Sequence, residues 1–200
     1  MHSPTLVHWQ LVKRILRYLK GTVDHGLLLS KASHFSFHGY VDAGWASDPD
    51  DRKSTSGFCV FFGGNLVTWG SKKQSIISRS SMEVEYRCLA TAATELIWLS
   101  SLFFDLHISV PLPILWCDNL SAVHLSANLI LHTKTKRVEF DIYFVRDLVL
   151  NKKSLVYHLP TTAQVADVLT KPLVAVNFTR LKLKLNVRDP YSIDLRDMKI

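Results

Sequence analysis

The apolar residues of this chain recur with two different periods, and the change of period marks where the expected elements begin and end. Between Leu6 and Leu19 they recur every three or four positions with basic residues between them, which predicts an amphipathic helix that Gly21 ends. After residue 34 the period becomes two and aromatic residues are frequent, as is typical of strands. Three consecutive antiparallel strands are expected within FSFHGYVDAGWAS, SGFCVFFGG and NLVTWGSKKQSII, joined by turns at DPDDRKSTSG and GGN.

A long helix is expected after the third strand. The segment that starts at Ser80 has the S-x-x-E pattern of a capping box, which predicts Ser80 as the N-cap and Glu83 as the third helical residue. Apolar residues then recur at helical spacing down to about Asp105, so one face of this helix is apolar. Pro111 and Pro113 end the linker that follows.

The second half of the chain alternates between strands and helices. The nearly all-apolar PILWCDN predicts a buried strand that ends at a carboxylate, and SLVYHLP predicts a fifth strand. Helices are expected over NLSAVHLSAN, over residues 137–150 and over TTAQVADVLTKPL, whereas the tail from Arg180 is expected to be ordered only in part. The predicted fold class is α/β: a five-stranded mixed sheet, three antiparallel strands followed by parallel ones, flanked by helices.

Composition narrows the range of functions. A chain of 200 residues, 48% hydrophobic and 20% charged, is enough for one α/β domain and excludes wholesale disorder. Lys and Arg outnumber Asp and Glu by 24 to 17, so the formal charge is +7 and an anionic partner such as nucleic acid is favoured. The three cysteines have no CxxC spacing, which argues against a disulfide framework and a thiolate zinc site and favours a reducing, intracellular compartment. No secretory signal is evident, and the longest apolar runs fall short of the roughly 20 residues of a membrane span.

Four acidic residues lie at the ends of expected elements or in apolar surroundings. Asp42 lies within the first expected strand, where an isolated carboxylate is costly to bury. Glu85 lies in the first turns of the long helix, Asp118 closes the buried strand, and Asp167 begins the last helix. Clustered carboxylates need compensating cations, and hard oxygen ligands select Mg²⁺ or Mn²⁺. These acids are far apart in sequence, so only the fold can bring them together.

Simpler roles stay open for these positions. Asp118 is also placed to cap the helix that follows it, and Asp167 is placed to pair with Lys171 four residues later. Glu83 and Glu85 point about 200° apart on a helix, so only one of them can face such a cluster. The capping box claims Glu83 and leaves Glu85 for the cluster.

Long blocks of the chain resemble one family. HWQLVKRILRYLKGTVDHGLLL, YVDAGWASDPDDRKSTSGFCVFFGGNLVTWGSKKQSIISRSSMEVEYRCLA, WCDNLSAVHLSANLILHTKTKRVEFDIYFVRDLV and QVADVLTKPL resemble, in this order, the C-terminal part of the Pol polyprotein of plant copia-type (Ty/copia) long-terminal-repeat retrotransposons. The STSG, SRSS-x-E-x-EY and CDN-x-SA blocks together are highly specific for this family. In the family, this region is the ribonuclease H domain that follows the reverse transcriptase.

The resemblance implies a ribonuclease H fold that hydrolyses the RNA strand of RNA–DNA hybrids with two Mg²⁺ ions, for which Mn²⁺ can substitute. By position, the acids of the family are Asp42, Glu85, Asp118 and Asp167, with Asp42 bridging both ions, and His158 is an accessory residue. The candidate nucleic-acid contacts are Lys72, Lys73, Arg79, Lys134, Lys136 and Arg137. The implied partners are an RNA–DNA hybrid and the reverse transcriptase domain of the parent polyprotein, with no membrane.

The resemblance also divides the chain into three parts. Residues 1–30 are expected to be the end of the reverse transcriptase, residues 31–175 a ribonuclease H-like domain, and residues 176–200 a tail. No polymerase Asp-Asp motif is present, so polymerisation, integration and proteolysis are not expected here. Met82, Val84 and the Arg137-Val138 pair depart from the residues usual in the family, which puts efficiency in question. The expected location is the cytoplasm, in virus-like particles, or the nucleus.

Two other functions stay open. A non-catalytic remnant would keep the fold and the positive charge and bind hybrids or DNA without turnover. A junction resolvase or an integrase core would use the same fold on another nucleic acid, but the helix-borne Glu85 and the preceding reverse-transcriptase tail argue against it. Cleavage of hybrid, duplex DNA and duplex RNA separates these functions.

Overall fold

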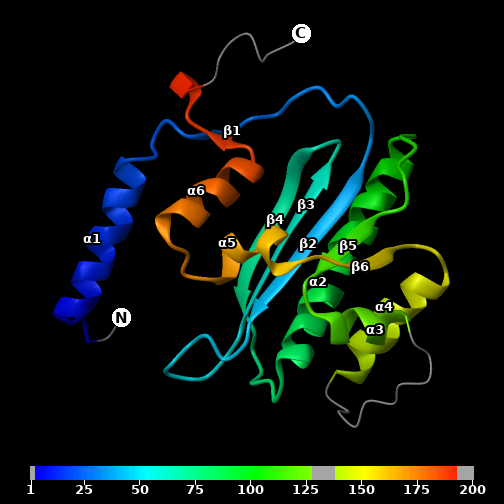
Figure 1. Ribbon diagram of the computed structural model, residues 1–200, viewed down its shortest axis with the longest axis horizontal. Helices are drawn as coiled ribbons and strands as arrows, with labels where there is room; N and C mark the ends of the chain where they lie inside the picture. The colour runs from blue at the N-terminus through cyan, green and yellow to red at the C-terminus, as the bar shows by residue number, and fades with distance from the viewer. Residues whose placement is uncertain (1–2, 128–137, 193–200) are drawn as a thin grey trace.

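The computed structural model describes residues 3–127 and 138–192 and arranges them around one five-stranded sheet (Figure 1). The sheet has the order β4-β3-β2-β5-β6. Neighbours among β2, β3 and β4 are antiparallel, whereas β5 runs parallel to β2 and β6 parallel to β5. The predicted α/β class and mixed sheet are confirmed. The strands are β2 (Phe37–Gly44), β3 (Thr55–Phe62), β4 (Asn65–Lys73), β5 (Ile114–Cys117) and β6 (Leu155–His158).

Helices and short elements surround this sheet. The first helix, the long helix and the two helices after β5 form close to where the apolar spacing predicts them. The helices are α1 (Leu6–Lys20), α2 (Ser81–Asp105), α3 (Leu120–Ala127), α4 (Glu139–Leu150), α5 (Asp167–Thr170) and α6 (Ala175–Lys184). The short elements are β1 (Gly26–Leu27), η1 (Thr161–Ala163), β7 (Val187–Arg188) and η2 (Pro190–Ser192).

The long helix α2 packs along one face of the sheet and supplies the larger hydrophobic core. At Gly39 of β2 the approach is close: a Cβ there would lie 2.8 Å from Leu115 Cδ2 and 3.4 Å from Leu96 Cδ1. By length and composition α2 is apolar enough to cross a membrane, but one side of it is buried in this core, which accounts for its apolar character. The core includes Val41, Val60, Val84, Cys88, Leu89, Leu96, Leu115, Cys117, Ile142 and Val145.

The opposite face of the sheet carries a second, smaller core. Side chains alternate between the two faces along a strand. Cys59 and Phe61 of β3 therefore belong to this second core, whereas Val60 between them packs on the α2 side. Val165 and Leu185 close the second core from the segments beside α5 and α6. These two helices cover the face of the sheet that α2 leaves free (Figure 1).

The helix predicted over TTAQVADVLTKPL forms only in part, as η1 and α5. Gln164 between them has extended backbone and is fully buried. Its Nε2 donates to the Val41 carbonyl at 2.7 Å, and its Oε1 accepts from the Ala166 N–H at 3.2 Å. These bonds to the central strand interrupt the helix, and α5 starts afresh at Asp167.

The segment from Arg180 packs more firmly than its alternating charges suggest. Leu181 and Leu185 lie four residues apart on one side of the chain, and both are buried. Further on, β7 pairs antiparallel with β1, an element that the period of the sequence does not predict. The three-part division of the chain stays a prediction.

The first helix, α1, forms as predicted but buries none of its residues. Its N-cap is Thr5 and its C-cap is Gly21. It lies beside α6, where the rings of Tyr18 and Phe178 meet edge to face at 6.1 Å between centroids (Figure 1). The apolar side chains of α1 are therefore mostly exposed in this chain.

Candidate active site

Four of the predicted acids come together at the end of β2 and β5. The register pairs Val41 with Cys117 on these parallel strands, so the next residues, Asp42 and Asp118, are also neighbours. Asp167 enters from the first turn of α5, and oxygens of these three carboxylates lie within 4.8 Å of one another. Glu85 enters from the second turn of α2, and one of its oxygens lies within the same distance of Asp118. Together the four define the acidic cluster.

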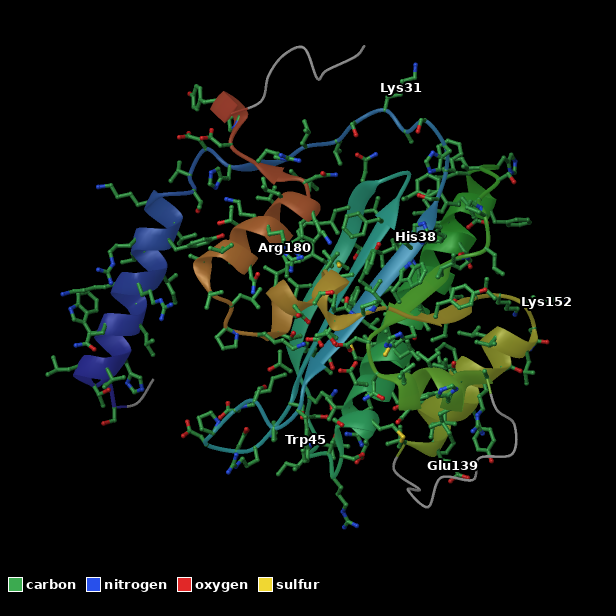
Figure 2. All side chains as sticks on the ribbon, in the orientation of Figure 1. Lys31, His38, Trp45, Glu139, Lys152 and Arg180 are labelled. Atoms are coloured by element: carbon green, nitrogen blue, oxygen red, sulfur yellow. The ribbon has the colours of Figure 1, made fainter. Side chains whose placement is uncertain are left out.

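The cluster lies at the end of β2 that leads into Trp45, which Figure 2 labels. Asp42 is the sixth residue of that strand and is 1% exposed. Trp45 links the end of β2 to the segment that precedes α2, because its Nε1 donates a hydrogen bond to the Ser78 carbonyl at 3.2 Å. The carboxylate of Asp42 is therefore held on the central strand of the sheet, where neighbouring strands and helices fix its position.

Glu85 is the most perturbed carboxyl group of the cluster. Its side chain is buried, and its Oε1 accepts from the Ala43 N–H at 3.1 Å. Its Oε2 has no hydrogen-bond partner among the described residues. Burial, and then the charges of Asp42 and Asp118, raise the pKa of Glu85 to about 9. A buried oxygen in this state needs either a proton or a cation.

Lys171 supplies a cation from within the chain. Its Nζ lies 2.9 Å from Asp42 Oδ1 and 2.7 Å from Asp167 Oδ1. Burial alone would lower the pKa of this ammonium group, but the hydrogen bonds to Asp167 and Asp42 outweigh burial and raise it. The Thr170 hydroxyl donates to the second oxygen of Asp42. The pairing of Asp167 with Lys171 is thus present, and it lies inside the acidic cluster rather than on a solvated face.

Asp118 and Asp167 share the perturbation of the cluster. Burial, followed by the charge of Asp42, raises the pKa of Asp118, which Lys171 and a hydrogen bond from Thr161 partly offset. Thr161 Oγ1 donates to Asp118 Oδ2 at 3.3 Å. Burial also raises the pKa of Asp167 despite its hydrogen bond with Lys171. The raised pKa values of Glu85, Asp118 and Asp167 have the same origin, which is burial of the carboxyl groups together with the negative charge of their neighbours.

Asp118 does not cap the helix that follows it. The capping oxygen belongs to Asn119, whose Oδ1 accepts from the Ala122 N–H at 3.1 Å. The capping alternative for Asp118 is therefore wrong, and the Asp118 carboxylate is left for the cluster.

Glu83 points away from the cluster and stabilises the start of α2. Ser80 is the N-cap, as predicted, and its hydroxyl accepts from the Glu83 N–H at 3.2 Å. The return bond of the capping box differs from the expectation, because Glu83 Oε2 accepts from the Arg79 N–H at 2.8 Å. Arg87 Nη2 lies 2.7 Å from Glu83 Oε1. The i,i+4 spacing of Glu83 and Arg87 in the sequence is the signal that indicates this pair.

The basic residues predicted to contact nucleic acid fall into three groups. Lys72 and Arg79 are exposed. Lys73 is engaged by two acids of the β2–β3 loop, Asp48 at 2.5 Å and Asp51 at 2.9 Å. Lys134, Lys136 and Arg137 lie outside the described residues.

A cavity of about 670 Å³ lies between α2 and the β3–β4 part of the sheet. Ser56 and Phe58 line it, so the cavity opens on the α2 side of the sheet, whereas Gly57 between them and its register partner Asp42 face α5. Lys72 and Arg87 are among the cations on its walls, and Asp141 also lines it. A groove with several cations on its walls is suited to a phosphate-bearing chain.

His158 lies at the end of β6 and not on a loop. It is the register partner of Cys117, the residue before Asp118, and its side chain is exposed. It is therefore close to the cluster in the fold, and its accessory role stays a prediction.

The sheet order, the helix along one face and the acids at the strand ends define a ribonuclease H-like domain. The crystal structure of LC11-RNase H1 in complex with RNA/DNA hybrid superposes with a TM-score of 0.52, covers 68% of this chain and 94% of that chain, and is 14% identical. At this identity the likeness concerns the fold alone. No family model matches the chain.

The relatives in sequence are transposon polyproteins. The retrovirus-related Pol polyprotein from transposon RE2 of Arabidopsis thaliana is 44% identical over 188 residues, which are 94% of this chain and 13% of the polyprotein. That from transposon TNT 1-94 of Nicotiana tabacum is 34% identical over 86% of this chain. The chain therefore belongs to the retrovirus-related Pol polyproteins of copia-type transposons. It spans 13% of the length of the relatives RE2 and TNT 1-94.

Proposed function

We propose that this chain is an endoribonuclease domain that hydrolyses the RNA strand of RNA–DNA hybrids with the help of divalent cations, as part of a transposon Pol polyprotein. The observation that carries the proposal is the meeting of Asp42, Glu85, Asp118 and Asp167 in one cluster. Four side chains from four separate elements converge there, although the cluster raises the pKa of three of them. Such an arrangement costs stability in the free protein and is typical of a catalytic site.

The residues present fit Mg²⁺. Carboxylate oxygens are the ligands that this ion prefers, and the buried Oε2 of Glu85 has no partner among the described residues. When bound, two divalent ions supply Lewis acidity and neutralise charge at the scissile phosphate. Asp42 is the central ligand of this proposal, because it lies nearest the middle of the sheet and the other acids surround it.

The protein's own groups prepare the site. At neutral pH the cation-free protein keeps a proton on Glu85 Oε2, since Oε1 already accepts from the Ala43 N–H and the pKa of this carboxyl is raised to about 9. Lys171 neutralises Asp42 and Asp167 in the same state. Because the Lys171 side chain is 36% exposed, it is free to swing from the carboxylates toward solvent or phosphate when a divalent cation binds.

The hybrid is proposed to lie across the acidic cluster and along the cavity between α2 and β4. Lys72 and Arg79 are exposed beside this path, and Arg87 lines it. A ribonuclease of this kind tells RNA from DNA through contacts to 2′-hydroxyl groups across a wide minor groove. The solved relative that holds an RNA/DNA hybrid supports the choice of substrate class.

The reverse transcriptase domain of the polyprotein is the proposed partner of α1. This helix presents exposed apolar side chains on several sides and buries none of its residues in this chain. The polyproteins to which the chain is similar are much longer, and one of their other domains is proposed to cover these apolar side chains. The exposed apolar residues of α1 are Leu6, Val7, Trp9, Leu11, Ile15, Leu16, Tyr18 and Leu19.

The second candidate is a non-catalytic domain that binds hybrids. Lys171 favours it, because the ammonium group lies between two of the four acids, where a divalent cation would be needed. The two candidates differ in whether Mg²⁺ displaces Lys171.

Cleavage assays separate these functions. The purified chain is incubated with end-labelled RNA–DNA hybrid, duplex DNA or duplex RNA, in Mg²⁺, in Mn²⁺ or in a chelator. The proposal expects cleavage of the RNA strand of the hybrid alone, and only with a divalent cation. Hybrid binding without any cleavage would select the non-catalytic function, and equal cleavage of duplex DNA would select a different nuclease.

A further inference from the structure

The acidic cluster contains a thiol that the proposed hydrolysis does not use. Cys117 is the last residue of β5 and directly precedes Asp118. Its Sγ, one oxygen of Glu85 and one oxygen of Asp118 all lie within 4.8 Å of one another. Asp118 is common to this trio and to the trio of aspartates.

Two atoms of this trio are poorly satisfied by the protein. Glu85 is 5% exposed, and its Oε2 has no hydrogen-bond partner among the described residues. The Cys117 thiol is fully buried, and its acceptor, the Asn119 carbonyl, is 3.9 Å away. By contrast, the thiol of Cys88 donates at 3.3 Å to the carbonyls of both Asp42 and Gly57. A buried oxygen without a partner, next to a weakly bonded thiol, offers two donor atoms that one ligand could bind together.

We propose that Cys117, Glu85 and Asp118 form a binding site for a thiophilic divalent cation of the zinc class. Zinc takes sulfur at about 2.3 Å and carboxylate oxygen at about 2.0–2.2 Å in tetrahedral sites, and a water supplies the fourth ligand. The three donor atoms lie within 4.8 Å of one another, so they need to close by at most roughly an ångström to reach this geometry. On binding, the S–H bond of Cys117 and the O–H bond of protonated Glu85 break, a Zn–S bond and Zn–O bonds form, and the two protons pass to solvent. The missing CxxC spacing argues against a site made of several thiolates, and the fold instead assembles one thiol with two carboxylates.

The two classes of cation would compete for the same carboxylates. Mg²⁺ prefers oxygen ligands, whereas thiolate selects zinc-class ions. A zinc ion held by Glu85, Cys117 and Asp118 withdraws two carboxylates from the set proposed for Mg²⁺. The site would then inhibit hydrolysis, a consequence that rests on the proposed function, whereas the zinc site itself does not.

The site is tested first without any nuclease assay. The full chain, freed of metals, is titrated with Co²⁺, and the near-ultraviolet thiolate-to-cobalt charge-transfer band is recorded. The proposal expects this band in the wild type and in Cys59→Ala, and its loss in Cys117→Ala. Cys59 is the matched control, because it is equally buried but lies in the core on the other face of the sheet. Cys117→Ser, closer in size to cysteine, replaces Cys117→Ala if thermal unfolding shows that the alanine variant does not fold.

The cobalt titration has two outcomes that would contradict the zinc site. Absence of the band in the wild type, or a band of full intensity without the Cys117 thiol, would overturn the proposal. The second arm titrates Zn²⁺ into Mg²⁺-supported cleavage of a hybrid, with each variant compared with its own rate in Mg²⁺ alone. We expect the half-inhibiting Zn²⁺ concentration to rise at least about tenfold in Cys117→Ala and to stay unchanged in Cys59→Ala. A half-inhibiting Zn²⁺ concentration that is unchanged in both variants contradicts the inhibitory role. If the chain cleaves no hybrid, the cobalt titration alone decides whether the zinc site exists.

Discussion

The ammonium group of Lys171 lies 2.9 Å from the carboxylate of Asp42, whose side chain is 1% exposed. The protein thus carries its own counter-ion at the place where the proposed hydrolysis needs a divalent cation. Because one position cannot hold both cations, the proposed function expects the binding of Mg²⁺ and the pairing of Lys171 with Asp42 to exclude one another.

Lys171→Met is expected to destabilise the metal-free protein and to increase the stabilisation by Mg²⁺. Asp42 and Asp167 lose a partner, and we expect a loss of about 1–3 kcal/mol, toward the lower end because Lys171 is partly exposed to water. Mg²⁺ then binds without having to displace an ammonium group, so it raises the unfolding free energy more in the variant than in the wild type. Urea unfolding in a chelator and in Mg²⁺ measures both effects.

Lys31→Met is the control for this experiment. Lys31 lies on an exposed loop at the far end of the sheet and points into solvent in Figure 2. The Lys31→Met substitution removes the same charge without changing the cluster. The stability of this variant and its response to Mg²⁺ are expected to match those of the wild type. Equal responses of the Lys171 and Lys31 variants would contradict the competition between Lys171 and the divalent cation.

The stability of the metal-free protein is expected to fall as pH rises through the neutral range. The pKa of Glu85 is raised from an ordinary value of 4.5 to about 9, so between these values the folded protein binds more protons than the unfolded chain. The contribution of Glu85 is fully present below pH 4.5 and is lost as pH approaches about 9, with a slope of at most about 1.4 kcal/mol per pH unit. Glu85→Gln is expected to flatten this slope, measured by urea unfolding in a chelator at several pH values. A variant with the same slope as the wild type would show that Glu85 titrates normally.

Gln164→Ala is expected to loosen the start of α5 and to displace Asp167. The side chain of Gln164 bonds the Val41 carbonyl and the Ala166 N–H in the interior, so its removal leaves two buried groups unpaired. We expect a loss of about 1–3 kcal/mol of unfolding free energy, measured in urea. The exposed neighbour Thr162→Ala is the matched control and is expected to unfold like the wild type. If the two variants are equally stable, the hydrogen bonds of Gln164 do not hold α5 in place.

Most of the fold could be predicted from the sequence, because its elements are long and their periods are regular. The alternation around Asp42 and the spacing down α2 predicted the strands and the long helix. The broken helix around Gln164 and the pairing of β1 with β7 could not be predicted in this way. Both depend on contacts between residues far apart in the chain, which local periodicity does not record.

The acids of the candidate site could be predicted from the sequence, but the side chains that contact them could not. Burial and position at element ends marked Asp42 and Asp118 as unusual, and the resemblance supplied the same set. The sequence does not show that Asn119 caps α3 or that Lys171 points into the cluster. The packed structure orients short polar side chains and long flexible ones, so local sequence does not determine their direction. The i,i+4 spacing of Asp167 and Lys171 indicates a pair in place of a catalytic role, whereas the fold places this pair within the cluster.

The central claim is that the carboxylates gathered around Asp42 hold the cations for hydrolysis of hybrid RNA. Its most direct test compares Glu85→Gln with Glu83→Gln, two changes of the same kind two residues apart on α2, in a Mg²⁺-dependent hybrid cleavage assay with folding checked by circular dichroism. Glu85 faces the cluster, whereas Glu83 is bonded to Arg87 and the backbone of Arg79. The account predicts that Glu85→Gln and Asp42→Asn each lower the cleavage rate by more than about 100-fold, because changing even a residue that only hydrogen-bonds to a metal ligand costs about 10–100-fold. Both variants are expected to bind hybrid still, and Glu83→Gln is expected to cleave it. Cleavage by Asp42→Asn or Glu85→Gln at the rate of the wild type would contradict the account.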